Sequence, residues 1–371
     1  AEGWRFESSR ARQKKHKYII ISLFNRIFFI IETMEKLFKE PEGIIYNGGA
    51  IFYAMTGYII GFFGLFNVNI IINILSALLL GHAMIIAAYL IHECAHNLVF
   101  KKIRFNTYLG RFFSWICGSS YGTYKDIQYK HFRHHVDVDD VVWFDYEAFF
   151  KKNPKVFKLT KILEWFYIPA HEFIMHFIMM FSSFIIPQRR NQRLRNTAVI
   201  AIRFPLFVLL MIFLPKVAMF YTISYILLLT VLRFMDSIQH DYPYNLTLFS
   251  NDKPTRKGQY EWEQEHTFSN PHSFDLEAVN WLTLNFGFHN AHHHNMAIPW
   301  YRLPQKHREL FGDSVETVVP FLSQLKIFHK NRVTRIYGNH DEYAPSGKEY
   351  LIAARKGETI GGNAASFLTS F

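Results

Sequence analysis

Cysteine and acidic side chains are scarce in this chain, and the two shortages together narrow its class. Only Cys94 and Cys117 occur among the 371 residues, which is too few for a disulfide framework and typical of a reducing compartment. Asp and Glu number 30 against 41 Lys and Arg, which gives a formal net charge of +11. No nucleic-acid-binding motif accompanies this charge. We therefore expect an anionic membrane surface, and no nucleic acid, as the partner of the basic residues.

Long apolar runs are plentiful by contrast. Half of the residues are hydrophobic and 18% are aromatic, and four stretches reach roughly the 20 residues that cross a hydrocarbon core. The predicted spans cover residues 44–66, 68–91, 197–214 and 217–234. Short turns near Asn67 and at Pro215-Lys216 join these spans in pairs. The sequence therefore predicts two transmembrane hairpins.

The distribution of lysine and arginine orients the hairpins. Basic residues precede the first span, follow the second and precede the third, whereas the turns within the hairpins hold only Lys216. Positive charge marks the cytoplasmic side, so both turns are expected on the opposite side. A further apolar stretch, 162–186, carries Glu164 and Glu172 and is expected to lie at the membrane interface. The stretch 18–31 is expected to be a basic amphipathic anchor.

The most specific feature is a set of histidine boxes. Two or three histidines recur three or four residues apart in three places, and one more stands between the second and third. They are His92 and His96; His131, His134 and His135; His289, His292 and His293; and the single His240. Residues at these spacings share one helix face, so each box turns its rings to one point. Neutral imidazole suits iron, zinc, copper or nickel, and so many ligands predict a centre of two metals on the cytoplasmic side.

The three boxes resemble the signature of the membrane fatty-acid desaturase superfamily, which includes related hydroxylases. The strings His-Glu-Cys-Ala-His, His-Phe-Arg-His-His and His-Asn-Ala-His-His stand in the same order, and the likeness covers roughly residues 44–312. It implies an all-α integral membrane protein, with four transmembrane helices in two hairpins and a cytoplasmic helical cap that holds a di-iron site. The resemblance also implies two Fe ions as the cofactor and O2 as a co-substrate.

The resemblance extends to the end of the fourth span. In acyl desaturases of this type a further histidine follows there, preceded four residues earlier by a polar side chain that helps one metal through water. Asp236-Ser-Ile-Gln-His240 occupies that place, and its spacing predicts that both residues share a helix face. An aspartate where some relatives have asparagine adds negative charge. The expected ligand set is therefore the nine histidines and Asp236.

Other polar residues near the boxes receive lesser roles. Glu93, Asp137, Asp139 and Asp140 flank the boxes and are candidates to hydrogen-bond the far nitrogen of a ligand histidine. His294 is expected to point away from the metals, because neighbouring helix positions diverge by about 100°. The remaining histidines considered, which are expected not to bind metal, are His171, His176, His266 and His272.

The resemblance favours an O2-dependent desaturase that introduces a double bond into an acyl chain. An acyl-chain hydroxylase, an alkene-forming fatty-acid decarboxylase and a carotenoid-type oxygenase stay open, because the cofactor carries the hard step in all of them. A membrane metal carrier is the non-enzyme alternative, but its ligands should line a path across the bilayer. The substrate is left open between acyl-CoA, acyl-ACP, free fatty acid and phospholipid.

The sequence also predicts the parts of the chain and its surroundings. We expect a basic N-terminal segment at 1–43, a catalytic membrane domain at 44–329 and a cytoplasmic tail at 330–371. No His-Pro-Gly-Gly haem signature occurs, so a separate electron donor of the cytochrome b5 or ferredoxin type is expected. We expect the chain to reside in the bacterial inner membrane or in the membrane of the endoplasmic reticulum.

Overall fold

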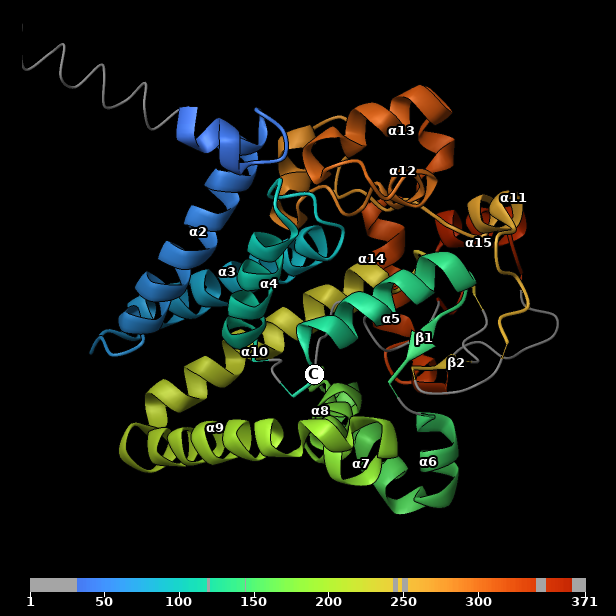
Figure 1. Cartoon of the computed structure of the whole chain (residues 1–371). Helices are drawn as coiled ribbons and strands as arrows, with labels where there is room; N and C mark the ends of the chain where they lie inside the picture. Colours follow the sequence, from blue (N-terminus) through green and yellow to red (C-terminus); the bar gives the residue numbers. More distant parts are fainter. Residues whose placement is uncertain are drawn as a thin grey trace, which may run out of the picture.

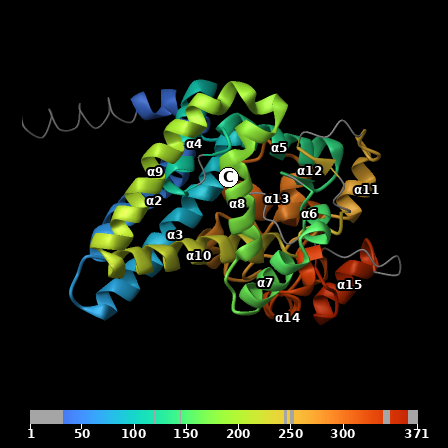
Figure 2. The same cartoon turned by 90° about the horizontal axis from the view of Figure 1, so that it is seen from below.

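The computed structural model describes residues 32–118, 121–143, 145–242, 246–248, 253–337 and 345–361. The predicted anchor at 18–31 lies outside these residues. Long helices form one end of the molecule, and a set of shorter helices, the cap, forms the other (Figures 1 and 2). The described part is all-helical apart from one pair of two-residue parallel strands, β1 (Val141–Val142) and β2 (Leu246–Thr247).

All four predicted spans are helices. They are α2 (Gly43–Gly64), α3 (Ile70–Ala95), α9 (Arg193–Phe213) and α10 (Pro215–Asp236). Among the described residues, three helical stretches are both long and apolar enough to cross a membrane: 70–95, 187–213 and 215–236. Helix α2 is continuous over 22 residues, but it contains six glycines and Asn47, which lower its mean hydropathy. The coarse prediction of a helical membrane protein is confirmed, and the four-span topology stays a prediction.

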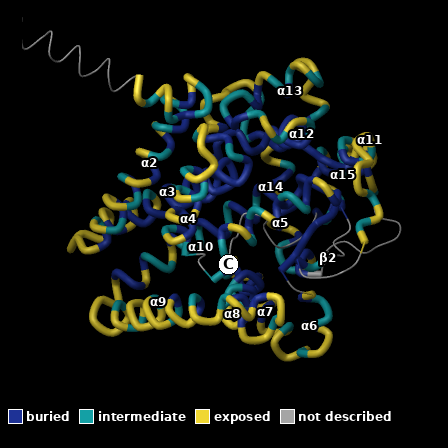
Figure 3. Tube along the Cα trace, in the orientation of Figure 1, coloured by how far each residue is buried: buried dark blue, intermediate teal, exposed yellow. Residues whose placement is uncertain are grey.

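Small residues let α2 and α3 pack closely. A Cβ atom on Gly61 would lie 2.8 Å from the backbone nitrogen of Leu80, so only glycine permits this approach. The turn between the helices is held by Asn73, whose amide donates to the carbonyls of Leu65 and Asn67, both at 3.0 Å. The exposed residues of α2 and α9 contrast with the buried interior of the cap (Figure 3).

The apolar stretch 162–186 does not form one long helix. Helix α7 (Pro154–Trp165) ends first, and α8 (Ala170–Ile185) begins after Pro169. Proline lacks a backbone N–H and disfavours a helical conformation in the residue before it, so it separates the two helices. The 16 residues of α8 fall short of the roughly 20 that a span needs.

The remaining helices surround the histidine boxes or flank the long helices. Between α3 and α9 lie α4 (Ile103–Ile116), α5 (Tyr124–Asp137), α6 (Tyr146–Lys152) and η1 (Pro187–Gln192). After α10 follow α11 (Tyr260–Glu265), η2 (Glu277–Thr283), α12 (His289–His294), η3 (Trp300–Arg302), α13 (Leu303–Phe311), η4 (Val315–Thr317), α14 (Phe321–Lys330), η5 (Thr334–Tyr337) and α15 (Lys348–Lys356). Within the predicted tail, α15 packs onto the cap through Tyr350 and Ala354.

Candidate metal centre

Helix α3 carries the first box from the apolar end of the molecule into the cap. The N-terminal half of the helix exposes large side chains such as Leu75 and Leu78, whereas every residue from Ala83 to His96 is buried. The helix runs past the predicted end at residue 91, so His92 lies in its last turn and His96 at its C-cap. Asn97 then adopts a left-handed conformation with φ 57°, which ends the helix.

Helix α5 presents the second box. Thr123 and Asp126 form a reciprocal capping box, with the Thr123 hydroxyl accepting from the Asp126 backbone at 3.1 Å. Asp126 also pairs with the buried guanidinium of Arg189 at 2.9 Å. These contacts fix the start of the helix, and the helix then directs its three histidines inward. Val138, with φ 54°, ends it just after the box.

Helix α12 presents the third box and depends on close backbone packing. A Cβ atom on Gly287 would lie 2.7 Å from both the Asn270 carbonyl oxygen and the Pro271 Cα, so a larger residue would displace the chain. Asn290 ties the helix to the preceding loop, because its side-chain oxygen Oδ1 accepts a hydrogen bond from the Ser269 hydroxyl at 3.0 Å. The histidines of this box are thereby held by a rigid local frame.

The structure brings all nine predicted histidines together in two groups. We call them the five-histidine group, which is His92, His96, His131, His135 and His292, and the four-histidine group, which is His134, His240, His289 and His293. One ligand atom of each member lies within 4.8 Å of that of every other member of its group. The grouping cuts across the boxes, since α5 and α12 each contribute to both groups.

The ring nitrogens within each group nearly touch. In the five-histidine group the Nε2 atoms of His96 and His131 are 2.6 Å apart, and those of His92 and His292 are 3.1 Å apart. In the four-histidine group His240 Nε2 lies 2.8 Å from His289 Nε2 and 3.1 Å from His134 Nε2. Many Nε2 atoms therefore converge on each of two points.

The protonation of these rings suits a cation. Burial lowers the pKa of His134 to about 4, and burial together with neighbouring imidazoles lowers the pKa of His135 and His293 well below the usual value. The rings are then neutral near pH 7 and offer lone pairs. The buried Nε2 of His293 has no hydrogen-bond partner among the described residues. Converging neutral imidazoles fit two transition-metal ions.

Several groups hold the outer nitrogens of these rings. Glu263 Oε1 lies 2.7 Å from His293 Nδ1, the Asp139 carbonyl lies 3.1 Å from His134 Nδ1, and the Thr267 hydroxyl lies 3.3 Å from His240 Nδ1. Of the flanking acids, Glu93 lies 3.4 Å from His92 Nδ1, whereas Asp137 pairs with Arg133. Such partners orient a ligand ring and raise its basicity. No motif marks Glu263 or Thr267 as partners of a ligand, because both lie far from any box in the sequence.

The predicted helix face shared by Asp236 and His240 is wrong. Helix α10 ends at Asp236, the chain turns, and His240 forms a β-bridge with Thr267. His240 nevertheless joins the four-histidine group, with the ring of Tyr242 packed against it at 4.2 Å. Asp236 is buried but belongs to neither group. The backbone pairing with Thr267 overrides the helical spacing.

The histidines expected not to bind metal have other contacts. His294 pairs with the hydroxyl of Tyr260, and His176 with that of Tyr225. His266 stacks on Trp262 at 3.8 Å, and His272 lies 3.0 Å from the Thr283 hydroxyl. His171 packs edge-on against Tyr146 at 4.5 Å.

Comparison with known proteins gives one match. Residues 69–324 match the family described as fatty acid desaturase. This range covers well over half of the 371 residues and contains all three boxes, Asp236 and His240. No curated protein and no solved structure matches the chain.

Proposed function

The chain belongs to the fatty acid desaturase family, and from that premise we propose that it introduces a double bond into the acyl chain of a lipid. As a member of that family with buried histidine clusters, it is an oxidoreductase. The observation that carries the proposal is the pair of buried histidine groups, which share the helices α5 and α12. A single metal ion would be bound by only one of the two groups and would leave the histidines of the other group without a metal to bind.

The two histidine groups would each bind one metal ion. The five-histidine group would hold one iron and the four-histidine group the other, with Asp236 reaching the second through water. Bound there, the iron pair supplies the O2 activation and C–H cleavage that no amino-acid side chain can perform. Glu263, Thr267 and the Asp139 carbonyl orient the rings of the four-histidine group. Burial of all nine histidines keeps bulk water away from the reacting carbon.

The topology we propose has two hairpins whose turns lie on the side opposite the histidines. Lys216 Nζ donates to the Asn67 carbonyl at 2.5 Å, so the two turns lie side by side at one end of the molecule. At the opposite ends of these helices, Lys101 and Lys102 follow α3, Arg190 precedes α9 and Arg193 begins it, and the positive-inside rule assigns that end to the cytoplasm. This holds for a bacterial inner membrane and for the endoplasmic reticulum alike.

Labelling of single cysteines tests that topology. In a variant that lacks Cys94 and Cys117, a cysteine at Asn69 or Lys216 should react with an impermeant reagent added outside. A cysteine at Gly122 should react only after the membrane is opened. Reaction at Gly122 from outside would reject the two-hairpin arrangement.

Lipid mass spectrometry tests the reaction. Cells that express the chain, together with a one-electron donor of the cytochrome b5 or ferredoxin class, should accumulate acyl chains two mass units lighter. Cells that express His135→Ala should not, although the variant still reaches the membrane. A gain of one oxygen or the loss of the carboxyl carbon would replace desaturation by hydroxylation or decarboxylation. Purified protein with one zinc, unaffected by the substitution, would reject the di-iron centre.

A further inference from the structure

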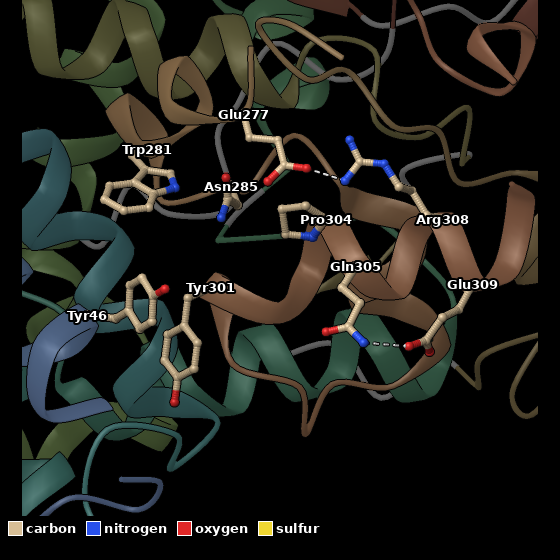
Figure 4. A pocket seen from close by; sticks show the side chains of 9 residues that line it. All are labelled: Tyr46, Glu277, Trp281, Asn285, Tyr301, Pro304, Gln305, Arg308 and Glu309. Carbon is tan, nitrogen blue, oxygen red and sulfur yellow. Dashed lines mark hydrogen bonds and ion pairs between the residues drawn. The ribbon is translucent and has the colours of Figure 1, made fainter. Parts of the chain in front are cut away.

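A pocket of about 500 Å³ lies beside the N-terminal end of α2, between η2 and α13 (Figure 4). None of the nine histidines lines it. Tyr46, Trp281 and Tyr301 form an aromatic wall on one side, and charged side chains of η2 and α13 form the other. The reaction proposed above gives this pocket no role.

We propose that the pocket binds the headgroup of a zwitterionic phospholipid, with its ammonium group against the aromatic wall and its phosphate beside Arg308. The proposal rests on the proposed function, because it names the class of lipid whose acyl chain is oxidised. Its binding part can be tested without turnover.

The aromatic wall suits an ammonium group. Tyr46 stacks on Tyr301 with ring centroids 4.7 Å apart, and it meets Trp281 edge-on at 5.8 Å. Trp281 keeps 48% of its surface exposed, so one face stays open to a ligand. Aromatic faces attract cations, and they recognise alkylated ammonium groups in particular.

The charge of the pocket selects a zwitterion. Glu277 and Glu309 line it together with a single cation, Arg308, which pairs with Glu277. Glu309 pairs in turn with Lys306, at 3.3 Å, so positive and negative charges are nearly balanced around the pocket. A free carboxylate, or a headgroup with several phosphates such as that of acyl-CoA, would bring negative charge alone beside Glu277 and Glu309. A headgroup with one ammonium and one phosphate matches both signs.

The pocket lies where a lipid headgroup would be. Helix η2 packs against the long helices, since His82 Nε2 lies 3.1 Å from the Leu282 carbonyl and His82 Nδ1 lies 2.6 Å from the Tyr53 hydroxyl. On this same element Val279 and Leu282 are exposed, at 38% and 50%. These exposed apolar residues lie on the same short helix as Glu277 and Trp281, which line the pocket. Aromatic residues favour that depth at the edge of a bilayer.

Hydrogen bonds join the pocket to the first histidine box. Asn285 lines the pocket and donates from Nδ2 to the Trp300 carbonyl at 3.1 Å. The Trp300 backbone N–H donates to Glu93 at 3.2 Å, and Glu93 lies beside His92. A headgroup held here is therefore fixed relative to the five-histidine group. Asn285 is 1% exposed and its Oδ1 has no hydrogen-bond partner among the described residues, so it can accept a bond from an ethanolamine ammonium.

Lipid titration of the purified, metal-loaded full-length protein tests the pocket. Native mass spectrometry would compare phosphatidylethanolamine, phosphatidylcholine and phosphatidylglycerol with identical acyl chains. We expect both zwitterionic lipids to bind roughly tenfold more tightly than phosphatidylglycerol, and Trp281→Leu to remove most of that difference. Trp115→Leu on α4 is the matched control, because Trp115 is 44% exposed and lies outside the pocket. It should leave the preference unchanged.

Asn285→Ala separates the two zwitterionic headgroups. It should weaken phosphatidylethanolamine more than phosphatidylcholine, because only the former donates hydrogen bonds. Equal binding of all three lipids by the wild type, or equal effects of Trp281→Leu and Trp115→Leu, would overturn the pocket assignment.

Turnover separates this inference from the proposed function. If lipid binding depends on Trp281 but the bound chains are never desaturated, the pocket assignment stands and the proposed reaction falls. If acyl chains are desaturated equally on all three headgroups and Trp281→Leu changes nothing, the reaction stands and the pocket assignment falls.

Discussion

The two histidine groups differ in how the protein holds them. The five-histidine group draws its rings from the ends or bodies of three helices, and the outer nitrogens of His131 and His135 have no hydrogen-bond partner among the described residues. In the four-histidine group, His134, His240 and His293 each have an outer partner. Outer hydrogen bonds therefore position more of the rings in the second group, although His289 Nδ1 lacks such a partner among the described residues and Glu93 lies beside His92 in the first group. The second group also has one imidazole fewer, which leaves room for a further ligand.

Removal of one ring from each group should break the centre most severely. His131→Ala and His289→Ala should each lower turnover by more than about a thousandfold, because each group would lose one of its few strong ligands. Metal analysis should show less than two irons per chain in both variants, and His294→Ala, which alters a neighbouring ring outside the groups, should keep both. Normal iron content in His289→Ala would remove that residue from the four-histidine group.

Asp236 tests whether the four-histidine group uses a further ligand. Asp236→Leu should lower turnover by roughly a hundredfold, while Asp236→Asn should cost about tenfold or less because it keeps an oxygen acceptor. The absorption spectrum of the bound iron should change in the leucine variant. Circular dichroism should show that the helical content of the variant equals that of the wild type. Equal activity of both variants and wild type would leave the four histidines without Asp236.

The outer hydrogen bonds should matter more for the four-histidine group than for the other. Glu263→Gln keeps the shape of the side chain but weakens its bond to His293, so iron affinity should fall by about tenfold. A competition titration with a chelator measures this loss. The matched control is Glu261→Gln on the same helix, because Glu261 is exposed and belongs to neither histidine group. An unchanged affinity in Glu263→Gln would show that packing positions both groups.

Acid should destabilise the iron-free protein in a defined range. The pKa of His134 is lowered to about 4 by burial, whereas the unfolded chain has the ordinary value of about 6.5. The unfolded state therefore binds the proton first, and stability is complete above pH 6.5 and declines as the pH falls toward 4. Each such histidine costs about 1 kcal/mol between pH 6.5 and 5.5. Chemical denaturation of the iron-free protein should show this decline, and His134→Phe should make it shallower.

Local spacing accounts for most of what the sequence predicts correctly. The boxes on α5 and α12 follow helical periodicity, so their inward direction could be read from three- and four-residue intervals. The long helices follow from apolar length, and the turn at Pro215 from proline itself. These features depend on residues close together in the chain.

The features that the sequence did not predict depend on contacts between distant residues. The division of the second and third boxes between two groups is set by how α3, α5 and α12 meet, and the spacing of histidines in the sequence does not record it. His240 leaves the helical path because Thr267 pairs with its backbone, and Glu263 reaches His293 from a separate short helix. An acid in a run such as Glu-Trp-Glu-Gln-Glu has nothing local that marks it as a partner of a ligand.

The close backbone packing at Gly287 has a consequence for genetic screens. Its missing side chain lets the backbone pass against Asn270 and Pro271 just ahead of the third box. A random screen for inactive alleles should therefore recover changes at this glycine as readily as changes at a metal ligand. Geneticists who mapped only chemically active side chains would misread such an allele as a distant, unexplained lesion.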